Sequence, residues 1–534
     1  MAIRDAVSGD LFLARDRYGK RPLFYADLRG EFLFASEMKA FRAYPGFRFE
    51  LDPRELESIF AVWTPLPDRT PFKGIRQLPM GGFLTLRDGH HTLHTYEELE
   101  VAAPPFTGSE AEAAAYVRET LRESVELRLR SDVEVGVYLS GGLDSSIVTK
   151  LATDLSSHEV RTFSVAFEDK TFDESGNQHE VASYLGTRHS SITVSAADIA
   201  ESFPSAVYHA EVPAFRTAFV PMYLLSRHAS DAGIKTILSG EGGPTRRFWA
   251  IRCSVRRCCG LHGTSCPRTS GRTSSLGLHP ELAHFGPAHR KHLTGLFQQF
   301  SVERLPGLFS HELRYQNGLF ATRLLKDRAE PFADALALVR MAPEYAALTP
   351  VQKAQWLEYK TLLAGYLLST QGERMGLAHG VENRCPFLDP AVVRAAAAVN
   401  LRFDDGFDEK AILKKAFRGE LPASSLTRPK QPYRAPGSAV FKEQRPDYLE
   451  LLLSDAELAQ LDCIDPAFAK RLVAKIMSTP RRRDQHQGGP GVRLSAVDRG
   501  PQPAVRHESR ELYGRPVEGP AERADDRGQA GQPA

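Results

Sequence analysis

The spacing of hydrophobic residues changes repeatedly between strand-like and helix-like patterns in the middle of the chain. Residues 133–139 (VEVGVYL) form a short valine-rich run, which predicts a strand buried in a parallel sheet. In the next segment, SSIVTKLATDL, the apolar residues recur at helical spacing and place Ile147, Val148 and Leu151 on one face of a helix. The same signals predict strands at 161–167 and 234–238 and helices at 108–132, 179–185 and 221–232. Strands that alternate with helices predict an α/β fold with a doubly wound parallel sheet.

The two ends of the chain follow other patterns. Residues 1–100 alternate short apolar runs with turns, which predicts antiparallel β structure. Beyond the third strand, helical spacing recurs at 356–369, 391–400 and 409–417. We therefore expect a β part at 1–100, followed at 108–475 by an α/β part that ends in helices.

Composition limits the class of protein. A chain of 534 residues is long enough for two to four domains. Its 68 basic and 66 acidic side chains give a net charge of +2, so nothing global indicates nucleic acid or an anionic membrane as a partner. No run of 18 apolar residues occurs, residues 1–5 do not resemble a signal peptide, and six cysteines are too few for a disulfide framework. We expect a soluble cytoplasmic protein.

Candidate chemistry lies between the first predicted strand and its helix, in the hexapeptide SGGLDS at 140–145. Gly141 and Gly142 permit a sharp turn, and the N–H groups at the start of a helix attract an anion. This predicts a phosphate cradle, although the lysine of a Walker loop is missing. An acid inside an anion cradle, Asp144, makes sense if a magnesium ion bridges it to a pyrophosphate. The alternative is a plain turn capped by serine.

A second motif, Ser239-Gly240-Glu241-Gly242, follows the third predicted strand. A glutamate between two glycines projects from the strand end with little steric hindrance. In a doubly wound sheet, ligands bind beyond the carboxyl ends of the strands, where both motifs fall. We therefore expect the two motifs to form one site.

The segment SGGLDSS at 140–146 resembles the PP-loop of ATP pyrophosphatases. Together with SGEG it is similar to the asparagine synthetase family and its β-lactam synthetase relatives. FSVAFED at 163–169, PMYLLSRHA at 221–229 and HGVENRCPFLD at 379–389 agree with this family. The resemblance covers residues 1–243 and about 281–475.

LARDRYGKRPLFY at 13–25 resembles the closing part of a class II glutamine amidotransferase domain, which uses an N-terminal cysteine as nucleophile. Here the first cysteine is Cys253. We therefore expect an N-terminally truncated remnant without a glutaminase nucleophile and with a poorly packed β part. The alternative is an unrelated β domain.

The resemblance implies ATP-dependent amidation of aspartate to asparagine through β-aspartyl-AMP, with release of AMP and pyrophosphate. Nitrogen comes from glutamine in the intact family, and we expect ammonia to supply it here. Glu241 is the expected general base, and Lys430 would neutralise developing negative charge. ATP and pyrophosphate would be bound by Tyr138, Leu139, Ser140, Gly141, Gly142, Asp144, Ser145, Val165, Ser239 and Gly240. Mg²⁺ would be held by Asp144 through the pyrophosphate.

Several alternatives stay open at this stage. The chain could be another amide-forming ligase resembling β-lactam synthetase, or a catalytically dead remnant. Glu241 could be a solvated capping residue and Lys430 a surface lysine. A homodimer is compatible with the sequence.

Two stretches do not fit the family. After Gly242 the family continues with a small residue and Asp-Glu, whereas this chain has Gly243-Pro244. The residues that follow, 244–280, contain seven arginines and no Asp, Glu or Lys. We interpret this stretch as out-of-register sequence; the alternative is a zinc site from Cys253, Cys258, Cys259, Cys266 and His262. Residues 480–534, rich in Arg, Gly and Pro, cannot bury a core, so this tail is predicted to be disordered or out of register.

Overall fold

The structure is a computed structural model that describes residues 1–97, 99, 101–242, 305–308, 310–399, 410–428 and 433–478. The predictions for residues 244–280, for the tail at 480–534 and for Lys430 concern residues outside these ranges.

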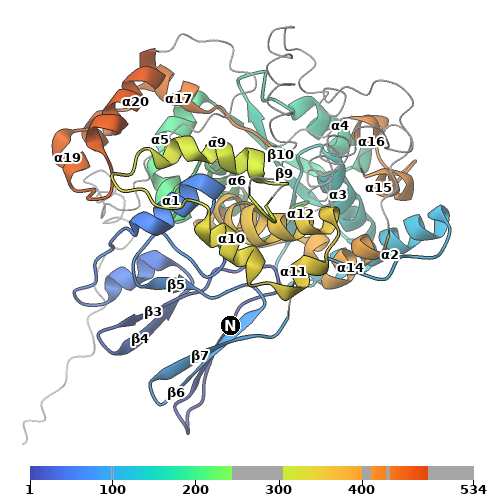
Figure 1. Ribbon diagram of the computed structural model, residues 1–534. Helices are drawn as coiled ribbons and strands as arrows, with labels where there is room; N and C mark the ends of the chain where they lie inside the picture. The colour runs from blue at the N-terminus through green and yellow to red at the C-terminus, as the bar shows by residue number, and fades with distance from the viewer. Residues whose placement is uncertain are drawn as a thin grey trace, which may run out of the picture. The chain divides into compact units, whose positions relative to one another are not determined.

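A five-stranded sheet forms the centre of the α/β part, with the strand order β10-β9-β8-β11-β12. Two of its strands, β9 and β10, are labelled among the helices in Figure 1. All four strand pairs are parallel. The strands are β8 (Val135–Tyr138), β9 (Arg161–Phe167), β10 (Arg188–Val194), β11 (Thr236–Leu238) and β12 (Glu382–Arg384). The three predicted strands and the mixed α/β class are confirmed. The two outer strands were not predicted, because RHSSITV and ENR are too polar to stand out.

Helices cover both faces of this sheet, since successive residues of a strand belong to different cores. Val137 and Leu238 join one buried cluster, whereas Tyr138 and Ile237 join another. The first cluster contains residues of α2 (Glu110–Leu129), α3 (Leu143–Leu155), α14 (Pro390–Ala398) and α15 (Ala411–Ala416). The second contains residues of α5 (Ala196–Ala210), α6 (Phe219–Asp231), α13 (Arg374–Leu377) and α17 (Ser438–Gln444). Two more helices are α4 (Ser175–Leu185) and α16 (Ala423–Thr427).

The N-terminal part consists of two antiparallel sheets, as predicted, with the orders β1-β2-β6-β7 and β4-β3-β5. Their strands are β1 (Ala2–Arg4), β2 (Leu11–Ala14), β3 (Phe24–Leu28), β4 (Glu31–Ala35), β5 (Ile75–Gln77), β6 (Gly82–Arg87) and β7 (His90–Thr95). The expectation of poor packing is wrong, because Leu13, Leu78 and Leu84 are completely buried.

Helices also occur in the N-terminal part: a 3₁₀ helix at Met38–Ala43 and the helix α1 (Pro53–Val62). The prediction missed α1 although its start signals are present. Asp52 caps it by accepting N–H bonds from Arg54 and Glu55, and Pro53 occupies the first turn.

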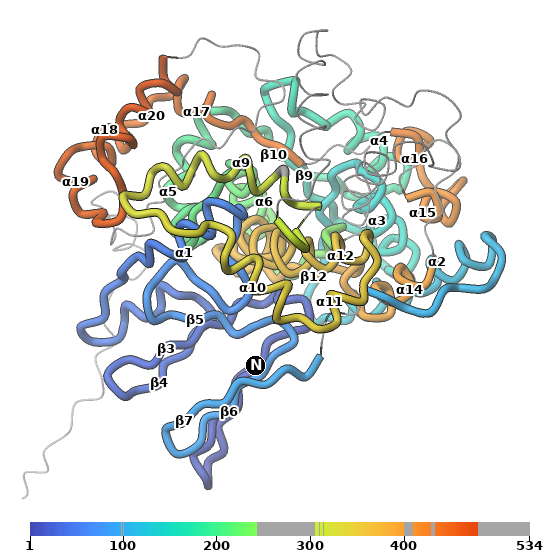
Figure 2. The backbone as a smooth tube through the Cα atoms, in the orientation of Figure 1, coloured from blue at the N-terminus to red at the C-terminus, as the bar shows by residue number. Residues whose placement is uncertain are grey.

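Helix α1 of the N-terminal part lies beside α9 (Glu312–Thr322) of the C-terminal part (Figure 2), and the two parts share a core. Leu56 and Phe60 of α1 belong to one buried cluster with Leu324 and Leu472. The remaining helices are α10 (Ala333–Arg340), α11 (Pro343–Ala347), α12 (Pro350–Glu358), α18 (Asp447–Leu452), α19 (Asp455–Ala459) and α20 (Pro466–Ser478). None of the described helices has the length and apolar composition needed to cross a bilayer.

Helix α12 continues without a break into a π-helix, η3 (Tyr359–Glu373). Sequence reasoning predicted a helix there but not its wider turns, which occur frequently at functional sites.

Candidate functional site

The predicted cradle forms where β8 ends and α3 begins. The chain turns through Gly141 at φ +70°. Within the turn, the hydroxyl of Ser145 accepts the Ser140 N–H at 3.2 Å and donates to the Gly142 carbonyl at 3.0 Å. Gly142 stands at the N-cap of α3 and has no side chain to bond the first N–H groups of the helix. These groups therefore face the turn, which is the arrangement that binds anions at helix N-termini.

The second motif packs directly on the first, because β11 pairs with β8 and both strands end at the same edge. A Cβ atom on Gly240 would lie 2.8 Å from the backbone nitrogen of Ser145 and 3.0 Å from the carbonyl carbon of Asp144. Only glycine permits so close an approach. The fold thus brings together the two motifs that the sequence placed at one edge.

Asp144 forms a buried ion pair with Lys410, the residue before α15. The Nζ atom of Lys410 lies 2.6 Å and 2.5 Å from the two carboxylate oxygens, and the side chains are 3% and 8% exposed. Residues 410–417 resemble a lysine-bearing segment of the family, but sequence reasoning assigned no role to Lys410. The cradle therefore contains a cation as well as an acid.

Glu241 lies against η3. A Cβ atom on Gly372 would lie 2.9 Å from Oε2 of Glu241, so this glycine makes room for the carboxylate. Burial, together with the charge of Glu241, raises the pKa of Tyr138. Burial also raises the pKa of the Cys385 thiol, whose sulfur lies 3.5 Å from the Ser239 hydroxyl. Tyr138 and Cys385 are therefore neutral neighbours of this site.

The residue after Gly372, Glu373, is fully buried and draws its countercharge from the N-terminal part. It forms an ion pair with Arg21, and the Nζ atom of Lys20 lies 3.9 Å away. Lys20 also donates a hydrogen bond to the carbonyl of Asn383 in β12. A turn of the N-terminal part thus reaches the helix that borders Glu241, which sequence reasoning did not foresee.

The main-chain groups expected to hold adenosine already have partners. The N–H of Leu139 donates to Phe163 at 2.9 Å, and its carbonyl accepts from the Ser164 hydroxyl. The carbonyl of Val165 accepts from the Gln178 amide at 2.9 Å. A carbonyl oxygen can accept a second hydrogen bond, so adenosine binding at these positions stays a prediction.

Arg216 marks a second polar region, which the sequence did not reveal. The residue is exposed, yet burial lowers the pKa of its guanidinium, with Arg314 and Arg434 acting in the same direction. Within the described part of the chain, Arg216 has no ion-pair partner; its guanidinium lies over the ring of Trp63.

Comparisons with known proteins match two family models to the chain. A family model described as asparagine synthase matches residues 116–247 and 262–491, and a glutamine amidotransferase domain model matches residues 1–97. The second match means that the expected N-terminal truncation is not supported.

Two bacterial relatives align over most of the chain. Asparagine synthetase [glutamine-hydrolyzing] 1 of Bacillus subtilis is 25% identical over 84% of this chain and 69% of its own length. A putative asparagine synthetase [glutamine-hydrolyzing] of Mycobacterium bovis is 29% identical over 82% of this chain and 66% of its own length. Amidase chyE of Penicillium rubens is 27% identical over 81% and 68%. The chain thus spans about two thirds of the length of these relatives.

Proposed function

The chain belongs to the asparagine synthase family, and we propose that it is an ATP-dependent ligase that amidates aspartate to asparagine. One observation carries the proposal: the turn at Gly240-Glu241 packs directly on the cradle that contains Asp144 and Lys410. A strand-loop-helix cradle for pyrophosphate at the end of a parallel sheet corresponds to the PP-loop arrangement.

The first step of the proposed reaction activates the substrate. A carboxylate oxygen of aspartate attacks the α-phosphorus of ATP, the bond to the β-phosphate breaks, and pyrophosphate leaves with the bonding electrons. The N–H groups at the start of α3 and the ammonium of Lys410 would stabilise the charge on the leaving pyrophosphate. The adenosine would lie at Tyr138, Leu139 and Val165, with Ser239 and Gly240 near the ribose and α-phosphate.

Asp144 is the residue that would hold magnesium. Within the described residues, no three His, Cys, Asp or Glu side chains form a metal site. Mg²⁺, however, is often held by one or two carboxylates together with substrate phosphates, a requirement that Asp144 meets. The ammonium of Lys410 faces both oxygens of Asp144, so the ion would compete with it. When bound, the ion would supply positive charge to the pyrophosphate.

The second step needs a base. Ammonia attacks the carbonyl carbon of β-aspartyl-AMP, AMP leaves, and the nitrogen loses a proton. Glu241 is the proposed acceptor of that proton, because its carboxylate projects from the turn that packs on the cradle. Lys430, outside the described residues, is proposed to neutralise negative charge in this step.

Arg216 is the proposed partner of the carboxylate of aspartate that does not react. An arginine presents paired N–H donors to a carboxylate, and this one lacks an ion-pair partner among the described residues. Its neighbour Tyr366 and Gly372, which borders Glu241, belong to the same helix. Six residues span about 9 Å in an α-helix, and less in the wider turns of η3. Both ends of the proposed substrate would therefore lie along η3.

Ammonia is the proposed nitrogen source for the chain as printed. The residues that match the amidotransferase model contain no cysteine, since the first is Cys253. Glutamine hydrolysis of the class II type requires a thiolate nucleophile.

The test measures AMP, pyrophosphate and asparagine from aspartate and ATP, with ammonium chloride or glutamine as nitrogen source. We expect product with ammonium, and we expect Glu241→Gln to lower asparagine formation about 10²–10⁴-fold. Glu126→Gln, a change to a half-exposed carboxylate on α2, is the matched control. Absence of aspartate-dependent AMP formation, or an unaffected Glu241→Gln variant, would contradict the proposal.

A second candidate is amidation of a different carboxylate, favoured by the amidase among the relatives. The same assay with a panel of carboxylic acids separates the two candidates. A dead remnant would form AMP with none of them.

A further inference from the structure

Trp63 is a residue of the N-terminal part that contacts Arg216. It ends α1 in the left-handed conformation, at φ +74°. Its ring is parallel to that of Phe215 within 9°, with the ring centres 5.9 Å apart. The guanidinium carbon of Arg216 lies 5.6 Å from the centre of the Trp63 ring. One aromatic surface therefore contacts both residues of the Phe215-Arg216 pair.

The two residues after Trp63 press against the helix η3. A Cβ atom on Gly365 would lie 1.9 Å from the Thr64 hydroxyl and 2.9 Å from the Pro65 carbonyl, so only glycine fits there. The next residue of the helix, Tyr366, is a neighbour of Arg216. The segment Trp63–Pro65 is thus fixed against the same helix that borders Glu241.

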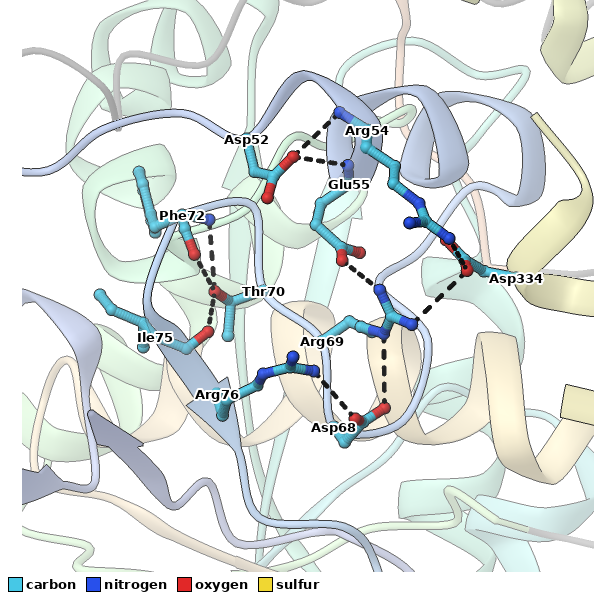
Figure 3. Close-up of polar contacts among 10 residues, drawn as sticks. All are labelled: Asp52, Arg54, Glu55, Asp68, Arg69, Thr70, Phe72, Ile75, Arg76 and Asp334. Carbon is cyan, nitrogen blue, oxygen red and sulfur yellow. Dashed lines mark hydrogen bonds and ion pairs between the residues drawn. The ribbon is translucent and has the colours of Figure 1, made fainter. Parts of the chain in front are cut away.

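The chain that follows is held by polar contacts to α10 (Figure 3). The carboxylate of Asp334 accepts hydrogen bonds from Arg54 at 2.9 Å and from Arg69 at 3.5 Å. Arg69 also pairs with Glu55, and the side chain of Asp334 is only 9% exposed. These contacts anchor both flanks of Trp63, since Arg54 and Glu55 precede it in α1 and Arg69 follows it.

The other charged neighbours of Arg216 act in opposite directions. Arg314 and Arg434 add positive charge nearby, whereas Tyr366 and Glu358 favour the charged guanidinium. An aromatic face attracts a guanidinium through the ring quadrupole and leaves the edge N–H groups free to bind. A guanidinium held over a ring is also preorganised, so less conformational freedom is lost when a ligand binds.

We propose that Trp63 is a positioning residue that holds Arg216 in place to bind the substrate carboxylate, so that the N-terminal part helps to select the substrate of the synthetase part. The inference rests on the proposed function for the identity of the substrate. It adds a role for the N-terminal part that does not involve glutamine.

The test compares the parent with Trp63→Leu and Trp63→Phe at saturating ATP and ammonium. We expect Trp63→Leu to raise the KM for aspartate about tenfold, with kcat and the KM for ATP within about twofold of the parent. Trp63→Phe keeps an aromatic face and should return the KM for aspartate to within about threefold. Circular dichroism checks that both variants fold. Equal changes in the KM values for ATP and aspartate, or a Trp63→Phe variant no better than Trp63→Leu, would overturn the inference.

Titration calorimetry with L-aspartate, without ATP, separates this inference from the proposed function. If the parent binds aspartate and Trp63→Leu binds it about tenfold more weakly, but no asparagine forms, the proposed function fails and the inference stands. If asparagine forms with an unchanged KM in Trp63→Leu, the inference fails and the proposed function stands. If the parent neither binds nor converts aspartate, both fail.

Discussion

The buried pair between Asp144 and Lys410 makes a strong prediction about stability. Asp144→Asn keeps the shape of the side chain but removes its charge, so the ammonium of Lys410, 3% exposed, loses its carboxylate. Breaking a buried pair on one side costs about 3–5 kcal/mol. The loss of unfolding free energy has an upper limit, because Lys410 can release its proton and stay buried as a neutral amine. From an ordinary pKa of about 10.4, this release costs about 4.6 kcal/mol at pH 7. We expect Asp144→Asn to lower the free energy of unfolding by about 3–4 kcal/mol at pH 7.

The same reasoning gives the sign of a pH dependence. In Asp144→Asn, the folded state binds the Lys410 proton less tightly than the unfolded state does. Stability should therefore rise with pH wherever the unfolded lysine keeps its proton, by up to about 1.4 kcal/mol per unit. The penalty relative to the parent should be smaller at pH 9 than at pH 7.

The assay is urea unfolding of the parent, Asp144→Asn, Lys410→Met and the double variant, followed by circular dichroism. The double variant removes both charges, so we expect it to recover at least about 2 kcal/mol relative to Asp144→Asn. Asp154→Asn is the control on the same helix. It breaks an exposed pair with Lys150 and should cost less than about 0.5 kcal/mol.

Activity separates stability from chemistry in this series. The double variant should fold and yet fail to form AMP, because the cradle has lost its acid and its cation. A stability of Asp144→Asn within about 1 kcal/mol of the parent, or a double variant no more stable than Asp144→Asn, would refute the buried pair.

Three further predictions concern other contacts. Gly240→Ala should lower the free energy of unfolding by about 1–3 kcal/mol and abolish AMP formation, because its Cβ would meet the cradle backbone. Gly176→Ala is the control: its Cβ meets nothing within 4 Å, so urea unfolding and the AMP assay should both give the values of the parent. Arg21→Gln should lower the free energy of unfolding, measured with urea, by about 1–2 kcal/mol, a modest loss because Arg21 is 39% exposed. The double variant Arg21→Gln/Glu373→Gln should recover most of this loss, and no recovery would contradict the pairing. Burial, with a smaller effect of His179, lowers the pKa of His189 to about 4. Between about pH 6.5 and pH 4, the unfolded state therefore binds a proton on this residue that the folded state does not bind. Stability should thus fall as pH drops from about 6.5 to 4, and His189→Gln should show a shallower fall.

The sequence alone determined the local parts of this protein. Periodicity located β8, β9, β11 and the helices α3, α4 and α6, because a strand or helix is defined by the spacing of neighbouring residues. Glycines and serine next to an acid, placed between a strand and a helix, predicted the cradle around Asp144. The rule that parallel strands end at one edge placed Glu241 beside it.

The tertiary structure decided which distant residues complete the site. Lys410 reaches Asp144 from the start of a short helix, and the residues around it do not reveal this partner. The turn with Lys20 and Arg21 supplies countercharge to Glu373 across 350 or more positions of sequence, and Trp63 reaches Arg216 from another part of the N-terminal region. Buried charges and stacked cations are stabilised by the particular partner that packing brings within a few ångströms. That partner is fixed by the whole fold, so the pattern of residues around each charge does not reveal it.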